Sequence, residues 1–283
     1  MVLISLARSA DSERRDTEVR HRHRRATEFK RMWVTQCGAG FDKPEGASLE
    51  VAVTVAVSDT ALRKAAKLVY LMVRFMPPSI FLRLTEKSSV GLFNSDEYIS
   101  EFPEYDSQGA CISAGSCSDP QCNKFCTVDS RPIYPEWSYG GPRAVSVDGN
   151  LMCGEELYNP NEKENLLITA FAETILKYGL SESLISQINS TYTTAMQHNT
   201  WRHFIPNVMR VSKYFKAATS VWFAGSPVMK NSDTGGMHIC SCHNEWDYRQ
   251  NIKQNDPALY ALLNEIYNNK REYLEGRLHM CDW

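Results

Sequence analysis

Nine cysteines in a chain of 283 residues limit most strongly what this sequence can fold into. Cytosolic thiols are kept reduced, whereas an oxidising compartment joins them, so this number predicts a secreted, extracellular protein with disulfide-stapled loops. The odd count leaves one thiol free, or one disulfide to another chain, and the pairing stays open. No CxxC pair occurs between residues 111 and 126, which disfavours a zinc knuckle there. The disulfide candidates are Cys37, Cys111, Cys117, Cys122, Cys126, Cys153, Cys240, Cys242 and Cys281.

The composition is that of a globular protein: 43% of residues are hydrophobic, 23% are charged, and the formal net charge is -2. This balance gives no general attraction to nucleic acid or to anionic lipid, so neither is an expected partner. No apolar stretch approaches the roughly 20 residues that a membrane span needs.

Residues 1–36 are predicted to be a flexible basic arm or the remnant of a processed leader. The opening run Met1–Ala7 resembles the tail of a signal peptide, which would make the sequence truncated upstream. Arg20–Arg25 is too charged to bury itself, and Arg24 and Arg25 could form a dibasic processing site. The sequon at Asn189 fits secretion and predicts a glycoprotein.

The first half alternates between strand and helix signals. The valine-rich segment Leu49–Val57 predicts a buried strand, and Asp59 is expected to cap an amphipathic helix after it. Two short apolar runs, Ile80–Leu84 and Val90–Phe93, are predicted to be further strands. Cys111–Gly149 has no sustained period and predicts a long loop held by disulfides.

The second half has helical spacing throughout. A helix capped by Asn161 is expected to end at Gly179 in a left-handed cap, and a second helix is expected over Glu182–Gln197. A third covers Val208–Trp222, and the last begins at Asp256–Pro257.

The first of these helices contains Leu166–Ile175, LLITAFAETI, which resembles the active-site helix LLVHEFAHTI of gluzincin-type zinc metallopeptidases. Such enzymes place two histidines one helical turn apart on one metal, with a glutamate that takes a proton from the bound water. Thr169, Ala170 and Glu173 stand where the family has histidine, glutamate and histidine. A later block, Lys213–Ala217, resembles the segment EYFAE, and Ala217 stands where the family has its third ligand.

The resemblance runs from Leu49 to Asn269 and implies an α/β (α+β) fold of zincin type. It predicts a small mixed sheet with helices in a lobe of residues 37–150, and a helical lobe of residues 151–283 across a cleft. Since Glu173 alone is a poor zinc site, we expect no metal and no zinc peptidase activity. The smaller residues predict a roomier, more apolar ligand pocket, lined by Thr169, Ala170, Glu173, Tyr214 and Ala217.

Two functions follow from this reading. The chain as a whole, with its basic arm and cysteine spacing, also resembles the secreted luciferases of bioluminescent marine worms. That likeness implies a monooxygenase, an oxidoreductase that oxidises a luciferin-like small molecule with O₂ and has no cofactor in the former zinc site. Its candidate catalytic residues are His198, His203 and Glu173. The alternative is a non-catalytic pseudo-metallopeptidase that binds a peptide or protein partner.

A third hypothesis is a peptidase whose metal is bound by other residues of the chain. It would draw its ligands from His198, His203, His238 and His243. Three convergent ligands are geometrically demanding to rebuild, which disfavours this reading.

Overall fold

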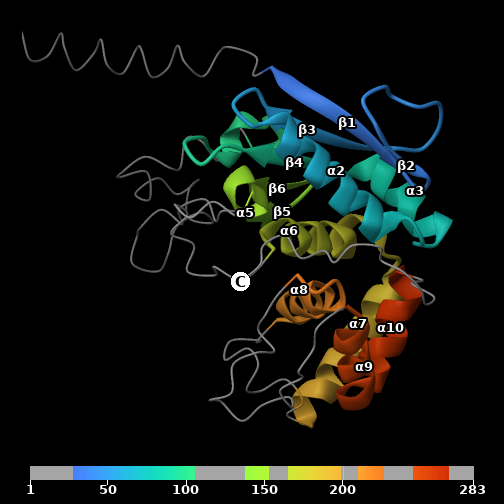
Figure 1. Cartoon of the computed structure of the whole chain (residues 1–283). Helices are drawn as coiled ribbons and strands as arrows, with labels where there is room; N and C mark the ends of the chain where they lie inside the picture. The colour runs from blue at the N-terminus through green and yellow to red at the C-terminus, as the bar shows by residue number, and fades with distance from the viewer. Residues whose placement is uncertain are drawn as a thin grey trace, which may run out of the picture.

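The computed structural model describes residues 28–105, 138–152, 165–198, 200, 210–225 and 245–267. A six-stranded sheet, with helices packed on one of its faces, forms the upper part of Figure 1, and a group of further helices forms the lower part. The predicted α/β class, with a mixed sheet in the first half and helices in the second, is therefore confirmed. Among the described residues, no helix is both long enough and apolar enough to cross a membrane.

The sheet has the strand order β2-β1-β3-β4-β6-β5. The strands β3, β4 and β6 run parallel to one another, while β1, β2 and β5 are antiparallel to their neighbours. Both edges of the sheet are therefore antiparallel strands, β2 on one side and β5 on the other. The strand bounds are β1 Phe29–Thr35, β2 Gly38–Gly40, β3 Leu49–Thr54, β4 Ser89–Phe93, β5 Ser138–Gly140 and β6 Arg143–Val147.

Strand β1 corrects the predicted arm, because the sheet includes Phe29–Thr35 and the arm was placed at residues 1–36. Met32 and Val34 are buried and lie in register with Val51 and Leu49 of β3. The alternation of these apolar residues outweighs the charge of Lys30 and Arg31. Residues 1–27, which carry the rest of the arm, lie outside the described part.

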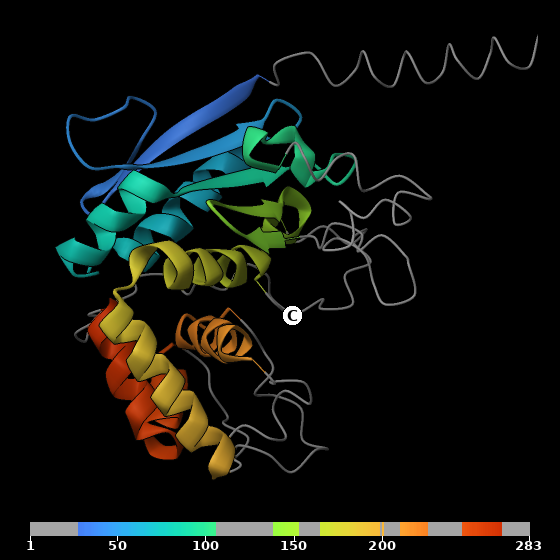
Figure 2. The same cartoon turned by 180° about the vertical axis from the view of Figure 1, so that it is seen from behind.

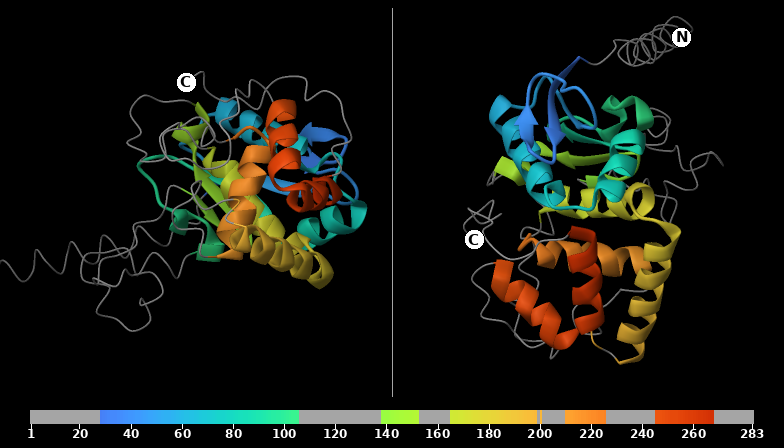
Figure 3. Two further views of the ribbon diagram at one scale, coloured as in Figure 1. Left: turned by 90° about the horizontal axis from the view of Figure 1, so that it is seen from below. Right: turned by 90° about the vertical axis from the view of Figure 1, so that its right-hand side faces the viewer.

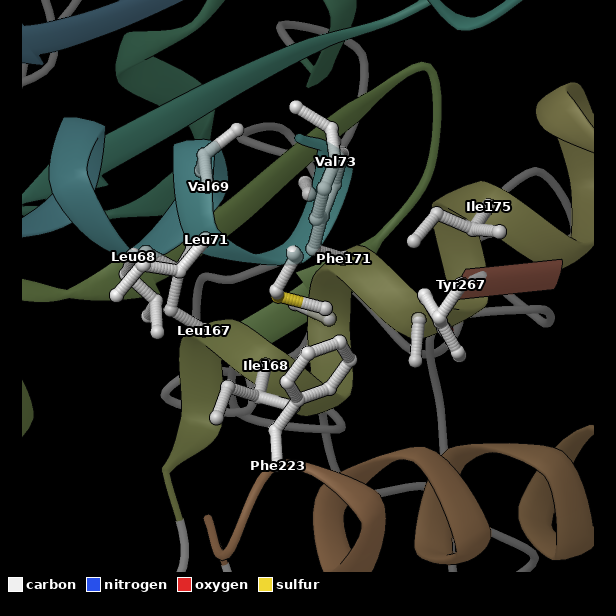
Figure 4. Packing of buried hydrophobic residues seen from close by; sticks show 14 of the residues in the cluster. Leu68, Val69, Leu71, Val73, Leu167, Ile168, Phe171, Ile175, Phe223 and Tyr267 are labelled. Carbon is white, nitrogen blue, oxygen red and sulfur yellow. The ribbon is translucent and has the colours of Figure 1, made fainter. Parts of the chain in front are cut away.

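Helix α2 (Asp59–Val73) begins as expected, one residue from the predicted cap. The side chain of Ser58, rather than Asp59, accepts a hydrogen bond from the backbone N–H of Ala61 at 3.1 Å. Its apolar side faces the sheet, and Figure 4 shows Leu68 and Leu71 beside Leu167 of helix α6 (Leu166–Thr174).

The predicted strand Ile80–Leu84 is wrong, since these residues lie in helix α3 (Pro78–Lys87). Pro78 suits the first turn of a helix, where its missing N–H costs nothing. Ile80, Phe81 and Leu84 are buried on one side of α3, at the helical spacing i, i+1 and i+4. A five-residue apolar run is ambiguous between strand and helix, and here tertiary packing selects the helix.

The predicted long loop Cys111–Gly149 is wrong at its end. Residues 138–149 form β5, β6 and the start of the short helix α5 (Asp148–Met152). Residues 106–137 lie outside the described part, and so do all the cysteine candidates except Cys37. Cys37 is exposed and forms no disulfide with a described residue.

The opposite face of the sheet is covered by the 3-10 turns η1 (Ile99–Glu101) and η2 (Pro103–Tyr105). Phe102 packs so closely on β4 that a Cβ on Gly91 would lie 2.6 Å from its ring. Buried Arg143 joins this face to the sheet, and its Nη2 lies 2.9 Å from a carboxylate oxygen of Glu50 and 2.9 Å from one of Glu104. A buried guanidinium needs such paired acceptors, and this network is structural.

Helix α6 lies between the sheet and the lower helices, as Figures 2 and 3 show. It continues into the π-helical turn η5 (Ile175–Gly179). Its N-cap is Asn165, whose side chain accepts from the N–H of Ile168 at 3.1 Å, while the predicted cap Asn161 is outside the described part. The predicted left-handed cap at Gly179 is wrong. Among the described glycines, Gly46 alone has a positive φ, so Gly179 is not in the left-handed conformation. Gly179 instead permits contact with α3, where a Cβ would lie 2.9 Å from Leu84.

The lower helices are α7 (Glu182–Gln197), α8 (Val211–Trp222), α9 (Glu245–Asn255) and α10 (Pro257–Tyr267). Helix α7 has its predicted bounds. Helix α10 begins as predicted, because Asp256 accepts from the N–H of Leu259 at 3.1 Å. Helix α8 ends at Trp222, as predicted. Its predicted first residue, Val208, lies outside the described residues. The sequence did not predict α9.

Candidate functional site at the junction of α6, β5 and α8

Helix α6 is held between the edge strand β5 and helix α8. A Cβ on Gly140 of β5 would lie 2.3 Å from the Cβ of Glu173 and 2.6 Å from the carbonyl oxygen of Ala170, so only glycine allows this approach. The hydroxyl of Thr174 donates to the carbonyl oxygen of Gly141 at 2.8 Å. Strand β5 is therefore fixed against the segment that carries the predicted site residues.

The carboxylate of Glu173 is held by two ammonium groups. Lys177, one helical turn later, lies 2.7 Å from Oε1, and Lys216 of α8 lies 2.9 Å from Oε2. Burial alone would raise the pKa of Glu173, but the attraction and hydrogen bonds of Lys216 and Lys177 together outweigh it and hold the pKa below its usual value. Glu173 is therefore an ionised, doubly paired carboxylate.

The two lysines connect three elements at this point. Besides Glu173, the ammonium group of Lys177 donates to the carbonyl oxygen of Gly140 at 2.9 Å, which links η5 to β5. Lys216 links α8 to α6. Its side chain is 23% exposed and that of Lys177 is 41% exposed, so both remain within reach of solvent. We call Glu173, Lys177 and Lys216 the lysine–glutamate cluster.

This cluster has the chemistry of an ion pair. Both oxygens of Glu173 accept hydrogen bonds from cations, and a dication would meet the repulsion of two ammonium groups at short range. Across the described ranges, no three histidine, cysteine, aspartate or glutamate side chains gather as a metal site would require. The group that lies beside Glu173 is the charged Lys216, and the roomier, more apolar pocket stays a prediction.

The other predicted pocket residues have different surroundings. Ala170 is 2% exposed and Tyr214 is fully buried, so neither presents an open surface. The phenol of Tyr214 donates to Asp256 at 2.8 Å, and burial together with the charge of Asp256 raises its pKa well above the usual value. Thr169 and Ala217 are half-buried. Tyr214 is thus a core residue that ties α8 to the start of α10.

His198 is not brought to the cluster. It is exposed and follows the last turn of α7, a helix that starts after Glu173 and η5 and leads away from α6 in Figure 2. A helix of 16 residues is about 24 Å long at 1.5 Å per residue. His198 therefore lies at the end of α7 that is far from Glu173. His203, His238 and His243 lie outside the described part.

A second polar group lies at the carboxyl ends of the parallel strands β3, β4 and β6. The hydroxyl of Thr54 donates to Glu97, which also accepts from the backbone N–H of Asn94 at 2.9 Å. The side chain of Asn94 donates to Asp148 at 3.4 Å. Burial raises the pKa of Asp148. The sequence reading missed this group, although polar residues directly after buried parallel strands are a usable signal.

Asn189, the predicted glycosylation position, is exposed on α7. An exposed side chain leaves room for a glycan, and the modification itself stays a prediction.

Comparisons with known proteins give one structural likeness. No protein-family model matches the sequence, and no curated protein matches it. The structure is similar to that of the Pro-Pro endopeptidase PPEP-2 from Paenibacillus alvei, with a TM-score of 0.41 and 13% sequence identity, over 77% of this chain and 97% of that one.

Proposed function

We propose that the chain is a non-catalytic binding protein on a metallopeptidase-like, zincin-type scaffold, and that it binds an extended peptide beside α6. The observation that carries this proposal is the lysine–glutamate cluster. Peptide hydrolysis on such a scaffold depends on a metal that lowers the pKa of a bound water. Here the acidic group of the site is neutralised by two lysines, which is suited to holding charge and not to activating water.

The position of β5 supports a peptide as the ligand. This strand is at the edge of the sheet, where its outer side can pair with an added strand. It is fixed to α6 through Gly140 and Gly141, so little further ordering is required when a ligand binds. Tyr139 of β5 is 36% exposed and offers an aromatic surface beside that edge.

Binding without turnover is the test. The full chain is incubated with an array of immobilised extended peptides, and the bound sequences are then incubated with the protein in solution and analysed by mass spectrometry. The proposal expects peptides that bind and stay intact. Cleavage of the bound peptides that is lost in Glu173→Gln would show a peptidase and overturn the proposal.

The oxidation of a luciferin-like molecule by O₂ stays a separate prediction, and no described arrangement of residues favours it over binding. Its test is light emission from purified protein with candidate luciferins in air. Light that depends on O₂ and is lost after heat denaturation would establish this activity and would replace binding as the main function.

A further inference from the structure

The lysine–glutamate cluster carries more positive than negative charge. Two ammonium groups face one carboxylate, and Glu173 is the one acidic side chain with which Lys177 and Lys216 pair in the described ranges. An ammonium group has three donor hydrogens. Within those ranges Lys177 uses two of them, on Glu173 and Gly140, and Lys216 uses one, on Glu173. Donors therefore remain for a further acceptor.

This excess charge adjoins the edge strand on which the proposed peptide binds. The ammonium group of Lys177 hydrogen-bonds to Gly140 and lies 5.6 Å from the centre of the Tyr139 ring. A ligand paired with β5 would thus pass close to Lys177. Lys216 approaches the same carboxylate from α8, on the other side of α6 from the sheet.

The start of α8 adds to the positive potential. Arg210, which precedes α8, is exposed, and the first turn of α8 has no acidic residue. The amino end of a helix also carries partial positive charge. These groups make no contact with Glu173, so they contribute to attraction at a distance rather than to the pairing itself.

We propose that the ligand bound beside β5 carries a carboxylate and that Lys177 and Lys216 recognise it. This inference rests on the proposed function and specifies the chemistry of the ligand. The carboxylate would accept the remaining ammonium hydrogens next to Glu173, so the ligand supplies the negative charge that the cluster lacks. An aspartate or glutamate side chain and a free peptide C-terminus share this chemistry.

The probes are pools of N-acetylated hexapeptides of mixed sequence with one fixed position. One pair of pools has glutamate or glutamine at that position, and each is made with a free or an amidated C-terminus. Binding to the full chain is measured by fluorescence anisotropy. Because charge-assisted hydrogen bonds are roughly twice as strong as neutral ones, we expect carboxylate-bearing pools to bind about tenfold more tightly than their amide counterparts.

Lys216→Met and Lys177→Met are expected to remove most of this preference, and Lys213→Met on the same helix is the matched control that retains it. Glu173→Gln provides a second test in the opposite direction. It removes the internal competitor for both ammonium groups, so carboxylate-bearing pools should bind more tightly to this variant. Circular dichroism checks that each variant is folded.

The outcomes separate the two claims. A preference for glutamate in amidated pools identifies an acidic side chain, and a preference confined to free C-termini identifies the chain end; both support the inference. Equal binding of carboxylate and amide pools overturns it and leaves peptide binding intact. Absence of binding by every pool overturns the proposed function, and this inference with it.

Discussion

The ammonium group of Lys216 lies 2.9 Å from Oε2 of Glu173 and joins helix α8 to helix α6. This contact connects the two halves of the molecule at the place where the sequence resembles a metal site. Its consequences can be measured separately for stability, for pH dependence and for binding.

Loss of this contact should lower stability moderately. The side chains are partly exposed, so we expect Lys216→Met to lower the free energy of unfolding by about 1 kcal/mol. Urea denaturation followed by circular dichroism measures the change. Lys213→Met removes an exposed lysine from the same helix and should change the value by less than about 0.5 kcal/mol. Equal effects of the two substitutions would contradict a role for the ion pair.

Glu173 should make stability dependent on pH in the acid range. Its pKa is lower in the folded than in the unfolded chain, so its contribution is present above the unfolded value of about 4.3 and is lost as the pH falls through the folded pKa. Glu173→Gln should therefore narrow the difference in stability between pH 6 and pH 3, as measured by urea titrations at both values. An unchanged difference would show that the folded pKa is not lowered.

The hydrogen bond between Tyr214 and Asp256 should contribute to the packing of α8 against α10. Tyr214→Phe removes the donor and leaves a buried carboxylate oxygen less well satisfied, at an expected cost of about 1–3 kcal/mol. Thermal denaturation provides the measurement. Tyr98→Phe is the control, since Tyr98 is 48% exposed and should tolerate the change. A neutral result for Tyr214→Phe would mean that water satisfies Asp256.

Gly140 should resist substitution because of its neighbours. In Gly140→Ala the new methyl group would lie 2.3 Å from the Cβ of Glu173, so β5 must move away from α6. We expect a loss of about 1–3 kcal/mol and weaker peptide binding. Gly38→Ala on the opposite edge strand is matched, because a Cβ there meets nothing within 4 Å. If both substitutions were equally mild, β5 would not be fixed to α6 as described.

The predicted disulfides can be tested by alkylation of the free thiols. Alkylation under denaturing, non-reducing conditions followed by peptide mass spectrometry should modify Cys37, which is exposed and unpaired in the described residues. We expect the remaining cysteines to be protected until a reductant is added. Modification of all nine before reduction would contradict the predicted disulfides and, with them, the expected secretion.

Local patterns in the sequence were sufficient for several elements. The apolar spacing in Glu182–Gln197 gave the bounds of α7, and Asp256 followed by Pro257 marked the start of α10. Helix α9 was missed because its buried face includes polar residues such as Glu245 and Arg249, which pair with each other at 2.9 Å. In the sequence, the charged residues of a buried ion pair have the same pattern as those of a solvent-exposed helix.

The candidate site was only partly readable from the sequence. The spacing of Glu173 and Lys177 is that of an ion pair on one helix. The pairing of Glu173 with Lys216 depends on the packing of α8 against α6, across 43 positions of sequence, which no local pattern encodes. The pocket was predicted from the small side chain of Ala217, without regard to the neighbouring Lys216.

Zinc binding that depends on Glu173 tests the central claim most directly. Equilibrium dialysis of the full chain against zinc is compared between the unaltered protein and Glu173→Gln. Since the two lysines already satisfy Glu173, we predict the same zinc content in both. Stoichiometric, tightly bound zinc that disappears in Glu173→Gln would contradict the account and make a metallopeptidase the better description.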